Sequence, residues 1–148
     1  MFRSIVVGTD GSDTAQTAVD EAVTLANSVG ARLHIVSAYE PVAADRLRVE
    51  RHQVPGDLQW MVNPREDVDT TLRAAADAAG SGGVSDVAIH ARQGDPADAI
   101  LDVAEEQGAD LIVVGNKGMT GAKRFLLGSV PNKVSHHAPC SVLIVRTI

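Results

Sequence analysis

The sequence predicts an α/β fold, namely an open, mostly parallel sheet of five strands with helices on both faces. Five short apolar runs alternate with helix-like segments along the whole chain, as in proteins built from βαβ units. The runs LIVV and VLIV are apolar at every position, which is typical of parallel strands covered on both faces. The chain has 148 residues, of which 45% are hydrophobic. We therefore expect a single domain, residues 1–148, with one buried core.

The predicted strands are residues 4–7, 33–36, 87–89, 111–114 and 142–145. The first is followed by the turn GTDGS and the third by QGDP, both rich in residues that end strands and begin helices. Since the carboxyl ends of parallel strands share one edge of a sheet, we expect these turns and the loop after the fourth strand to lie at the same edge.

Two of the predicted helices have clear signals at both ends. The first has Ser12 as its N-cap and Gly30 as its stop, with apolar residues at three- and four-residue spacing between them. Another has Asp95 as N-cap, Pro96 at its first position and Gly108 after its end. Each should pack one face on the sheet.

The remaining helices are predicted at residues 67–79, rich in alanine, and from Ser129 to a point before Pro139, with Pro131 tolerated in the first turn. Residues 40–65 break the alternation, because they hold three prolines and mixed charge without a helical period. We interpret them as a surface excursion. Trp60 within it either covers a ligand or packs locally, and the sequence leaves both open.

Composition narrows the class of protein. The formal net charge of −6 and the pI near 5.2 provide no general basic surface for nucleic acid or anionic lipid. A single cysteine, Cys140, rules out an internal disulfide framework and fits a reducing compartment. The apolar run near the N-terminus is too short for a signal peptide or a membrane span. We expect a cytoplasmic protein that contacts neither membrane nor nucleic acid.

The loop GNKGMTGAKRFLLGS, residues 115–129, has the chemistry of a phosphate site. Gly115 and Gly118 leave backbone amides uncovered by side chains, and Gly128 with Ser129 places a small residue and a hydroxyl at a helix start. There the unpaired N–H groups and the helix dipole favour an anion. Local positive charge comes from Lys117, Lys123 and Arg124. A phosphorylated ligand is predicted.

This loop is neither a Walker A motif nor a dinucleotide-binding G-x-G-x-x-G turn; its spacing is G-x2-G-x9-G-S. With this spacing the chain resembles the ATP-binding branch of the universal stress protein family. The resemblance extends over nearly the full length, through the segments VVGTDGS, SAYEP, GDPADAIL, LIVVGNKG, GSVPNKV and APCSVLIVR.

The resemblance implies a flavodoxin-like (Rossmann-like) sheet in the order 3-2-1-4-5, a homodimer, ATP bound with a divalent ion such as Mg²⁺ or Mn²⁺, and a regulatory role in the stress response. It implies that Asp10 lies near the ribose or the metal and that Ala38 borders the adenine. The residues implied to line the nucleotide are Thr9 and Asp10 in the first turn, Gly115, Asn116, Lys117 and Gly118 around ribose and phosphates, and Gly128, Ser129 and Val130 at the phosphate tail.

Several alternatives stay open from the residues alone. Asp10 has a second interpretation as a helix cap, and Lys123 and Arg124 as solvated surface charges. His136 and His137 are adjacent on a helix and point in different directions, so no metal site is predicted there. Cys140 is expected to be a small core residue rather than a reactive thiol.

The function also has alternatives. The loop predicts a phosphate cradle without fixing the number of phosphates, so cyclic AMP remains a candidate ligand beside ATP. No nucleophile and base form a recognisable catalytic motif, so no catalytic residues are predicted. Slow ATP hydrolysis, or a nucleotidyl-transfer enzyme on the same fold, is the enzymatic alternative to a nucleotide-binding regulator.

The last strand leads to a prediction about assembly. In the order 3-2-1-4-5 the strand at residues 142–145 lies at the edge of the sheet, and only a few residues follow it. An apolar edge strand with free backbone groups tends to pair with another chain. We therefore expect a homodimer in which this strand pairs with its own copy around a two-fold axis.

Overall fold

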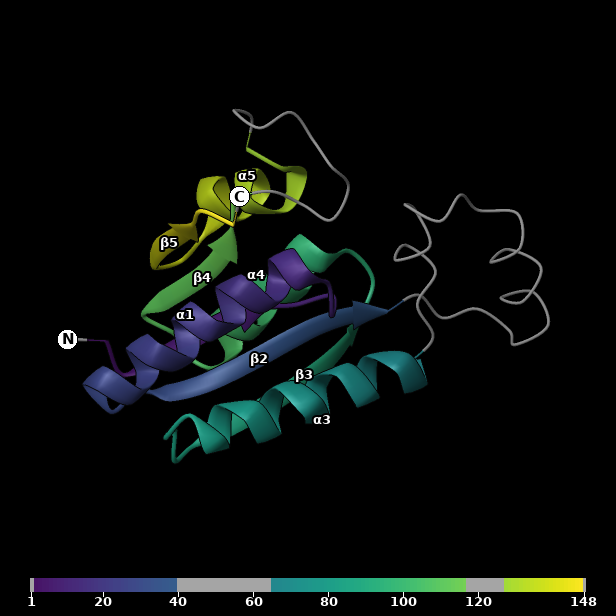
Figure 1. The fold of residues 1–148 in the computed structure, drawn as a ribbon. Helices are drawn as coiled ribbons and strands as arrows, with labels where there is room; N and C mark the ends of the chain where they lie inside the picture. The colour runs from purple at the N-terminus through teal and green to yellow at the C-terminus, as the bar shows by residue number, and fades with distance from the viewer. Residues whose placement is uncertain (1, 40–64, 117–126, 148) are drawn as a thin grey trace.

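The computed structural model describes residues 2–39, 65–116 and 127–147 of the chain. These ranges contain one sheet of five parallel strands, with neighbours in the order β3-β2-β1-β4-β5 (Figure 1). The strands are β1 (Ser4–Gly8), β2 (Arg32–Tyr39), β3 (Val87–Gln93), β4 (Leu111–Gly115) and β5 (Ser141–Val145). The predicted α/β class and the predicted strand order are both confirmed.

The helices of the described ranges cover both faces of the sheet (Figure 1). They are α1 (Asp13–Val29), α3 (Arg65–Ser81), α4 (Pro96–Glu106) and α5 (Ser129–His137). Residues of α1 and α3 share one apolar cluster with the sheet, and residues of α4 and α5 share the other. Ile5 and Val7 belong to the first cluster and Val6, between them, to the second. Burial on both faces explains why these strands are apolar at successive positions.

The helix ends follow local sequence signals. Ser12 is the N-cap of α1, and its Oγ accepts a hydrogen bond from the Ala15 N–H at 3.2 Å. Gly30 ends α1 in the left-handed conformation with φ of 68°, which favours glycine. Asp95 caps α4 by accepting from the Asp98 N–H at 3.0 Å. These predicted caps and the predicted stop at Gly30 are confirmed.

Three elements are longer than predicted by more than one residue. β2 continues to Tyr39 and β3 to Gln93, because the parallel ladder between them extends to the pair formed by those two residues. The predicted third strand ended at residue 89 because the rest of the edge strand β3 contains polar side chains, which interrupt the apolar run. α3 begins at Arg65, so the predicted excursion ended one residue too late. The rest of that excursion, residues 40–64 with Trp60, lies outside the described residues.

Candidate functional site

The predicted ligand residues follow strands that leave the sheet at one edge. β1 is paired with β2 on one side and with β4 on the other, so the strand order reverses between β1 and β4. Ligands of open α/β sheets bind at this kind of switch point, outside the carboxyl ends of the strands. Gly8 ends β1 and Gly115 ends β4 there, so Thr9 with Asp10, and Asn116, emerge at the same edge.

The first turn is held by its own side chains. The Thr9 N–H donates to the Val36 carbonyl at 2.9 Å, which fixes the end of β1 against β2. Asp10 Oδ1 accepts from the Ser12 N–H at 3.0 Å and from Ser12 Oγ at 2.6 Å. Ser12 is therefore the N-cap of α1, and Asp10 orients Ser12 instead of capping the helix itself. Within the described residues, Asp10 Oδ2 makes no hydrogen bond.

Gly11 in the same turn needs to be glycine. Its φ is +83°, a conformation that side-chain-bearing residues rarely adopt, and a Cβ there would lie 3.2 Å from the Thr71 side chain of α3. Ala38 lies near the end of β2, on the face that packs against the α4 cluster. It is two residues beyond Val36, the strand residue to which Thr9 is bonded.

Within the described residues, the start of α5 has no side-chain cap. Its N-cap is Gly128, which offers no side chain, whereas α1 and α4 are capped by side chains. Among the helices of residues 2–39, 65–116 and 127–147, α5 alone has no acidic residue in its first turn. In residues 2–39, 65–116 and 127–147, no capping side chain thus engages the N–H groups of Ser129 and Val130, where the helix dipole favours an anion. Ser129 is the first helical residue rather than the N-cap, and its side chain is exposed.

Asn116 connects the two ends of the glycine loop. Its carbonyl accepts from the Gly128 N–H at 3.0 Å, so the residue after β4 and the N-cap of α5 are in contact. Its side-chain oxygen accepts from the Thr147 N–H at 2.9 Å and from Thr147 Oγ1 at 3.0 Å. Between these ends, the predicted phosphate-loop residues Lys117 and Gly118, like Lys123 and Arg124, lie outside the described residues.

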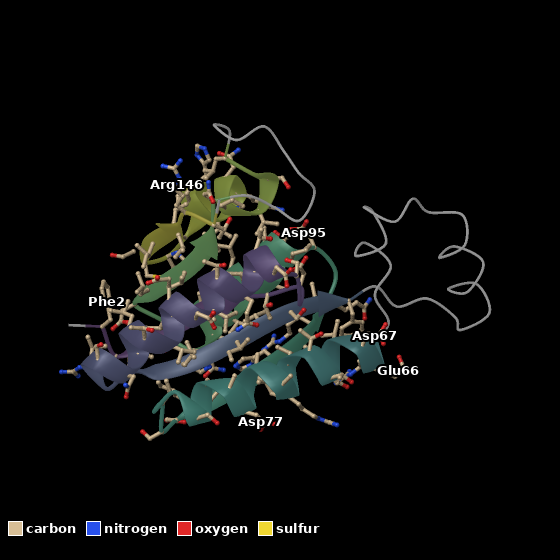
Figure 2. The ribbon with its side chains drawn as sticks, in the orientation of Figure 1. Phe2, Glu66, Asp67, Asp77, Asp95 and Arg146 are labelled. Atoms are coloured by element: carbon tan, nitrogen blue, oxygen red, sulfur yellow. The ribbon has the colours of Figure 1, made fainter. Side chains whose placement is uncertain are left out.

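One cation near this edge was not singled out from the sequence. Lys133 of α5 contacts two carboxylates at the start of α4, with Nζ at 2.8 Å from Asp98 Oδ1 and at 3.4 Å from Asp95 Oδ2. These hydrogen bonds, the one to Asp98 foremost, raise the pKa of Lys133. Asp95 lies at the start of α4, and Glu66 and Asp67 at the start of α3 (Figure 2). The positive charge of Lys133 is therefore already paired with Asp95 and Asp98. The start of α4 carries these two carboxylates, whereas the first turn of α5 carries none, so α5 is the better anion site of the two.

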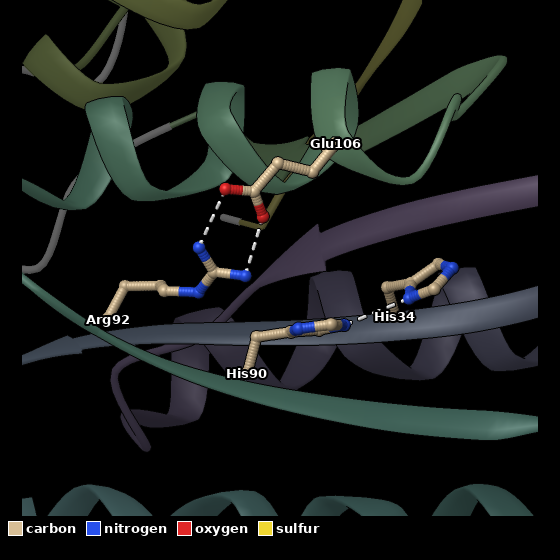
Figure 3. Close-up of polar contacts among 4 residues, drawn as sticks. All are labelled: His34, His90, Arg92 and Glu106. Atoms are coloured by element: carbon tan, nitrogen blue, oxygen red, sulfur yellow. Dashed lines mark hydrogen bonds and ion pairs between the residues drawn. The ribbon is translucent and has the colours of Figure 1, made fainter.

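A polar cluster in which only His34 is buried lies between the sheet and α4 (Figure 3). His34 on β2, 1% exposed, and His90 on β3 share a hydrogen bond, with His34 Nδ1 and His90 Nε2 3.0 Å apart. Arg92 forms a two-fold ion pair with Glu106 of α4, at 3.0 and 2.7 Å. Burial, followed by the neighbouring His90, lowers the pKa of His34 to about 4. No sequence pattern singled out this pair, because its members are 56 residues apart.

Cys140 packs where the sequence predicted. It is partly buried against the cluster formed by α4, α5 and the sheet, and this burial raises the pKa of its thiol. A raised thiol pKa disfavours the reactive thiolate. None of the helices in the described part of the chain is long and apolar enough to cross a membrane.

Comparisons with known sequences and with solved structures point to the same protein family. Residues 1–146 match the sequence profile of the universal stress protein family. The chain is 40% identical over 151 residues to universal stress protein Rv1636 of Mycobacterium tuberculosis, covering 99% of this chain and 97% of that protein. It is 38% identical to universal stress protein YxiE of Bacillus subtilis, covering 99% and 100%. A crystal structure of a universal stress protein in complex with cAMP is 35% identical, covers 99% of this chain and 98% of its own, and gives a TM-score of 0.74.

Proposed function

Because this chain belongs to the universal stress protein family, we propose that it is a regulatory protein that binds an adenine nucleotide, ATP in the first place, at the edge formed by β1, β4 and α5. The observation that carries the proposal is the start of α5, where the amides of Ser129 and Val130 have neither a capping side chain nor an acidic neighbour in the first turn. Such a helix start, preceded by glycine, favours phosphate.

The remaining predicted residues fit a nucleotide laid across this edge. Phosphates would bind the amides after Gly128, together with Gly115 and the loop residues Lys117 and Gly118. The carboxylate of Asp10 has one oxygen engaged with Ser12, and the other suits a divalent ion such as Mg²⁺ or Mn²⁺, or a ribose hydroxyl. A bound ion of this kind would neutralise phosphate charge. Ala38 would border the adenine.

Cyclic AMP is the second candidate ligand. The observation that favours it is the solved universal stress protein with bound cAMP, which is 35% identical to this chain. Both ligands place an adenosine and at least one phosphate at the same edge, so the same helix start would hold either. The two differ in the number of phosphates and in the use of a divalent ion.

Isothermal titration calorimetry with ATP, ADP, AMP and cyclic AMP, each with and without Mg²⁺, tests the proposal. We expect saturable binding of ATP that strengthens with Mg²⁺. Preference for cyclic AMP without a metal effect would move the assignment to the second candidate, and no binding of any of these nucleotides would refute both. A steady-state phosphate-release assay on the same preparation separates a binding protein from the slow ATPase alternative.

A further inference from the structure

Asn116 links three elements that meet at the proposed site. It is the first residue after β4, and its N–H donates to the carbonyl of Val145, the last residue of β5, at 2.8 Å. Its carbonyl accepts from the N–H of Gly128, the N-cap of α5. Its side-chain oxygen holds Thr147, just beyond β5, through both the backbone N–H and the hydroxyl. The end of β4, the start of α5 and the end of β5 are thereby joined through one residue.

The hydrogen bonds of the Asn116 side chain limit which role it can have at the proposed site. An amide oxygen has two lone pairs, and Thr147 supplies a donor to Asn116 Oδ1 twice, at 2.9 and 3.0 Å. The oxygen is therefore engaged and is not available to accept from a ribose hydroxyl. Removing it would leave the partly buried Thr147 N–H without its partner, which costs more than a single exposed hydrogen bond.

We infer that Asn116 is a positioning residue for the proposed nucleotide site, acting through Thr147 and Gly128 rather than by contact of its side-chain oxygen with the nucleotide. The inference rests on the proposed function and adds to it. Gly128 sets where the free amides of Ser129 and Val130 point, and Asn116 sets where Gly128 lies. Thr147, which lies near the end of the sequence and far from the loop along the chain, becomes part of the support of the phosphate site.

A neutral amide suits this position. An aspartate would offer Thr147 the same acceptor but would add a negative charge beside the start of α5, where an anion is proposed to bind. An alanine would remove the acceptor altogether. Asparagine provides the acceptor without the charge, which is what a residue supporting an anion site requires.

Amide hydrogen exchange measured by NMR on the ligand-free protein tests the support itself. In Asn116→Ala we expect the Thr147 amide to exchange about fivefold faster or more, since it loses its acceptor. The Gly128 amide keeps its main-chain acceptor at residue 116, and we expect it to exchange faster because that residue is no longer held by Thr147. The amides of Val7 and Val113, in the central strands, should keep their rates and so show that the fold is intact. Unchanged rates at Thr147 and Gly128 would overturn the inference.

A double-mutant cycle on ATP affinity tests the link to the nucleotide. Thr147→Val removes the hydroxyl donor while keeping the shape of the side chain and the backbone N–H. We expect roughly tenfold weaker binding in Asn116→Ala and about threefold in Thr147→Val. In the double variant we expect no further loss beyond Asn116→Ala alone, because both changes break the same contact. Ser28→Ala, which removes an exposed hydroxyl contact near the far end of α1, is the control and should bind as the wild type does.

The outcomes are distinguishable. Wild-type affinity in Thr147→Val beside a loss in Asn116→Ala, or a further threefold loss in the double variant, would mean that Asn116 acts independently of Thr147 and would overturn the inference. A wild-type protein that binds no adenine nucleotide would instead refute the proposed function, and with it the nucleotide part of the inference. In that case the hydrogen-exchange result still decides whether Asn116 holds Thr147 and the start of α5 in place.

Discussion

Gly128 and Gly11 are glycines for different physical reasons. Gly11 has a φ of +83°, so its backbone conformation requires glycine. Gly128 has φ of −65° and ψ of 167°, angles open to any residue. What Gly128 contributes is the absence of a side chain next to the free amides of α5. A residue with a side chain could adopt the same backbone there but would crowd an approaching phosphate.

We therefore predict that Gly128→Val weakens ATP binding at least tenfold, on the order of a lost charge-assisted hydrogen bond or more, because its methyl groups would occupy the phosphate's position. The matched control is Gly80→Val, a glycine of α3 around which nothing lies within 4 Å of an added Cβ. It should bind ATP normally. Titration calorimetry measures both affinities, and circular dichroism checks that each variant is folded. Normal ATP binding by a folded Gly128→Val protein contradicts this role of Gly128.

Two histidines, His34 of β2 and His90 of β3, lie where α4 packs against the sheet. His34 lies beside His90 of β3, with Arg32 of its own strand and Asp86 before β3 as further charged neighbours, while Arg92 and Glu106 lie near His90. Burial acts most strongly on His34, and the positive charges around it act in the same direction, so its neutral form is favoured in the folded protein. A protonated His34 would have to be accommodated beneath α4 with little access to water.

This arrangement predicts a loss of stability in mild acid. The unfolded chain protonates His34 near its ordinary pKa of 6.5, whereas the folded protein resists protonation until about pH 4. As the pH falls from about 6.5 to 4, the contribution of His34 to the free energy of unfolding is lost, on the order of 3 kcal/mol. Urea unfolding at a series of pH values, on wild type and His34→Gln, measures it.

We expect His34→Gln to show a flatter decline in stability over this pH range than the wild type, since glutamine does not titrate. His136→Gln, at an exposed histidine of α5, is the matched control and should follow the wild-type curve. Parallel curves for wild type and His34→Gln would show that this histidine does not produce the pH dependence.

The elements that the sequence predicted well are those specified locally. Ser12, Gly30 and Asp95 act within a few residues of their own helix ends, so their roles can be read from neighbouring residues. The apolar run LIVV likewise marks β4, which is buried on both faces, whereas VLIV of the edge strand β5 exposes Leu143 and Ile144. The extra length of β2 and β3 depends on pairing between strands far apart in the chain, which a local pattern does not contain.

The contacts around the candidate site show the same limit. The sequence placed Asn116 beside the ligand, but it held no sign that Asn116 bonds to Thr147, 31 residues away. The His34 and His90 contact depends on the register of two parallel strands in the same way. The spacing of glycines leads to a proposed site at this loop, because the loop and the helix start are contiguous in sequence. Partners brought together by the tertiary fold required the structure.

The two edge strands of the sheet, β3 and β5, differ in the side chains that they carry. β3 carries the ion pair of Arg92 with Glu106 on one face, whereas β5 exposes Leu143 and Ile144 on its opposite faces, at 40% and 39%. Charged groups protect an edge strand from pairing, and apolar side chains with free backbone groups favour it. We propose, as the sequence suggested, that β5 pairs with its copy in a homodimer.

The matched pair Ile144→Lys and Ile89→Lys tests this proposal. Ile144 on β5 and Ile89 on β3 are the same residue type, each 39% exposed on an edge strand. Two lysines brought together by a two-fold axis at β5 would repel, so we expect Ile144→Lys to be monomeric and Ile89→Lys to remain a dimer. Light scattering on each variant gives the mass. A monomeric wild type at micromolar concentration, or equal effects of the two substitutions, would contradict the β5 dimer.

The proposed nucleotide site depends on the amides at the start of α5. Substitutions of Ser129 can remove one of these amides with little other change. Ser129 is the first helical residue, where proline is favoured because its missing N–H has no helical partner to lose. Gly128 before it already has the extended backbone that precedes proline well. Ser129→Pro should therefore fold normally while lacking one amide, and Ser129→Ala should keep the amide and lack only the hydroxyl.

Calorimetric titration of wild type, Ser129→Ala and Ser129→Pro with ATP and Mg²⁺ is the most direct measurement. We expect Ser129→Ala to bind up to about fivefold more weakly, for one neutral hydrogen bond, and Ser129→Pro to bind roughly tenfold more weakly still, for a hydrogen bond to a charged group. Equal affinities in the two variants, with thermal unfolding showing both to be folded, would mean that the amides of α5 do not hold the phosphates and would contradict the proposed site.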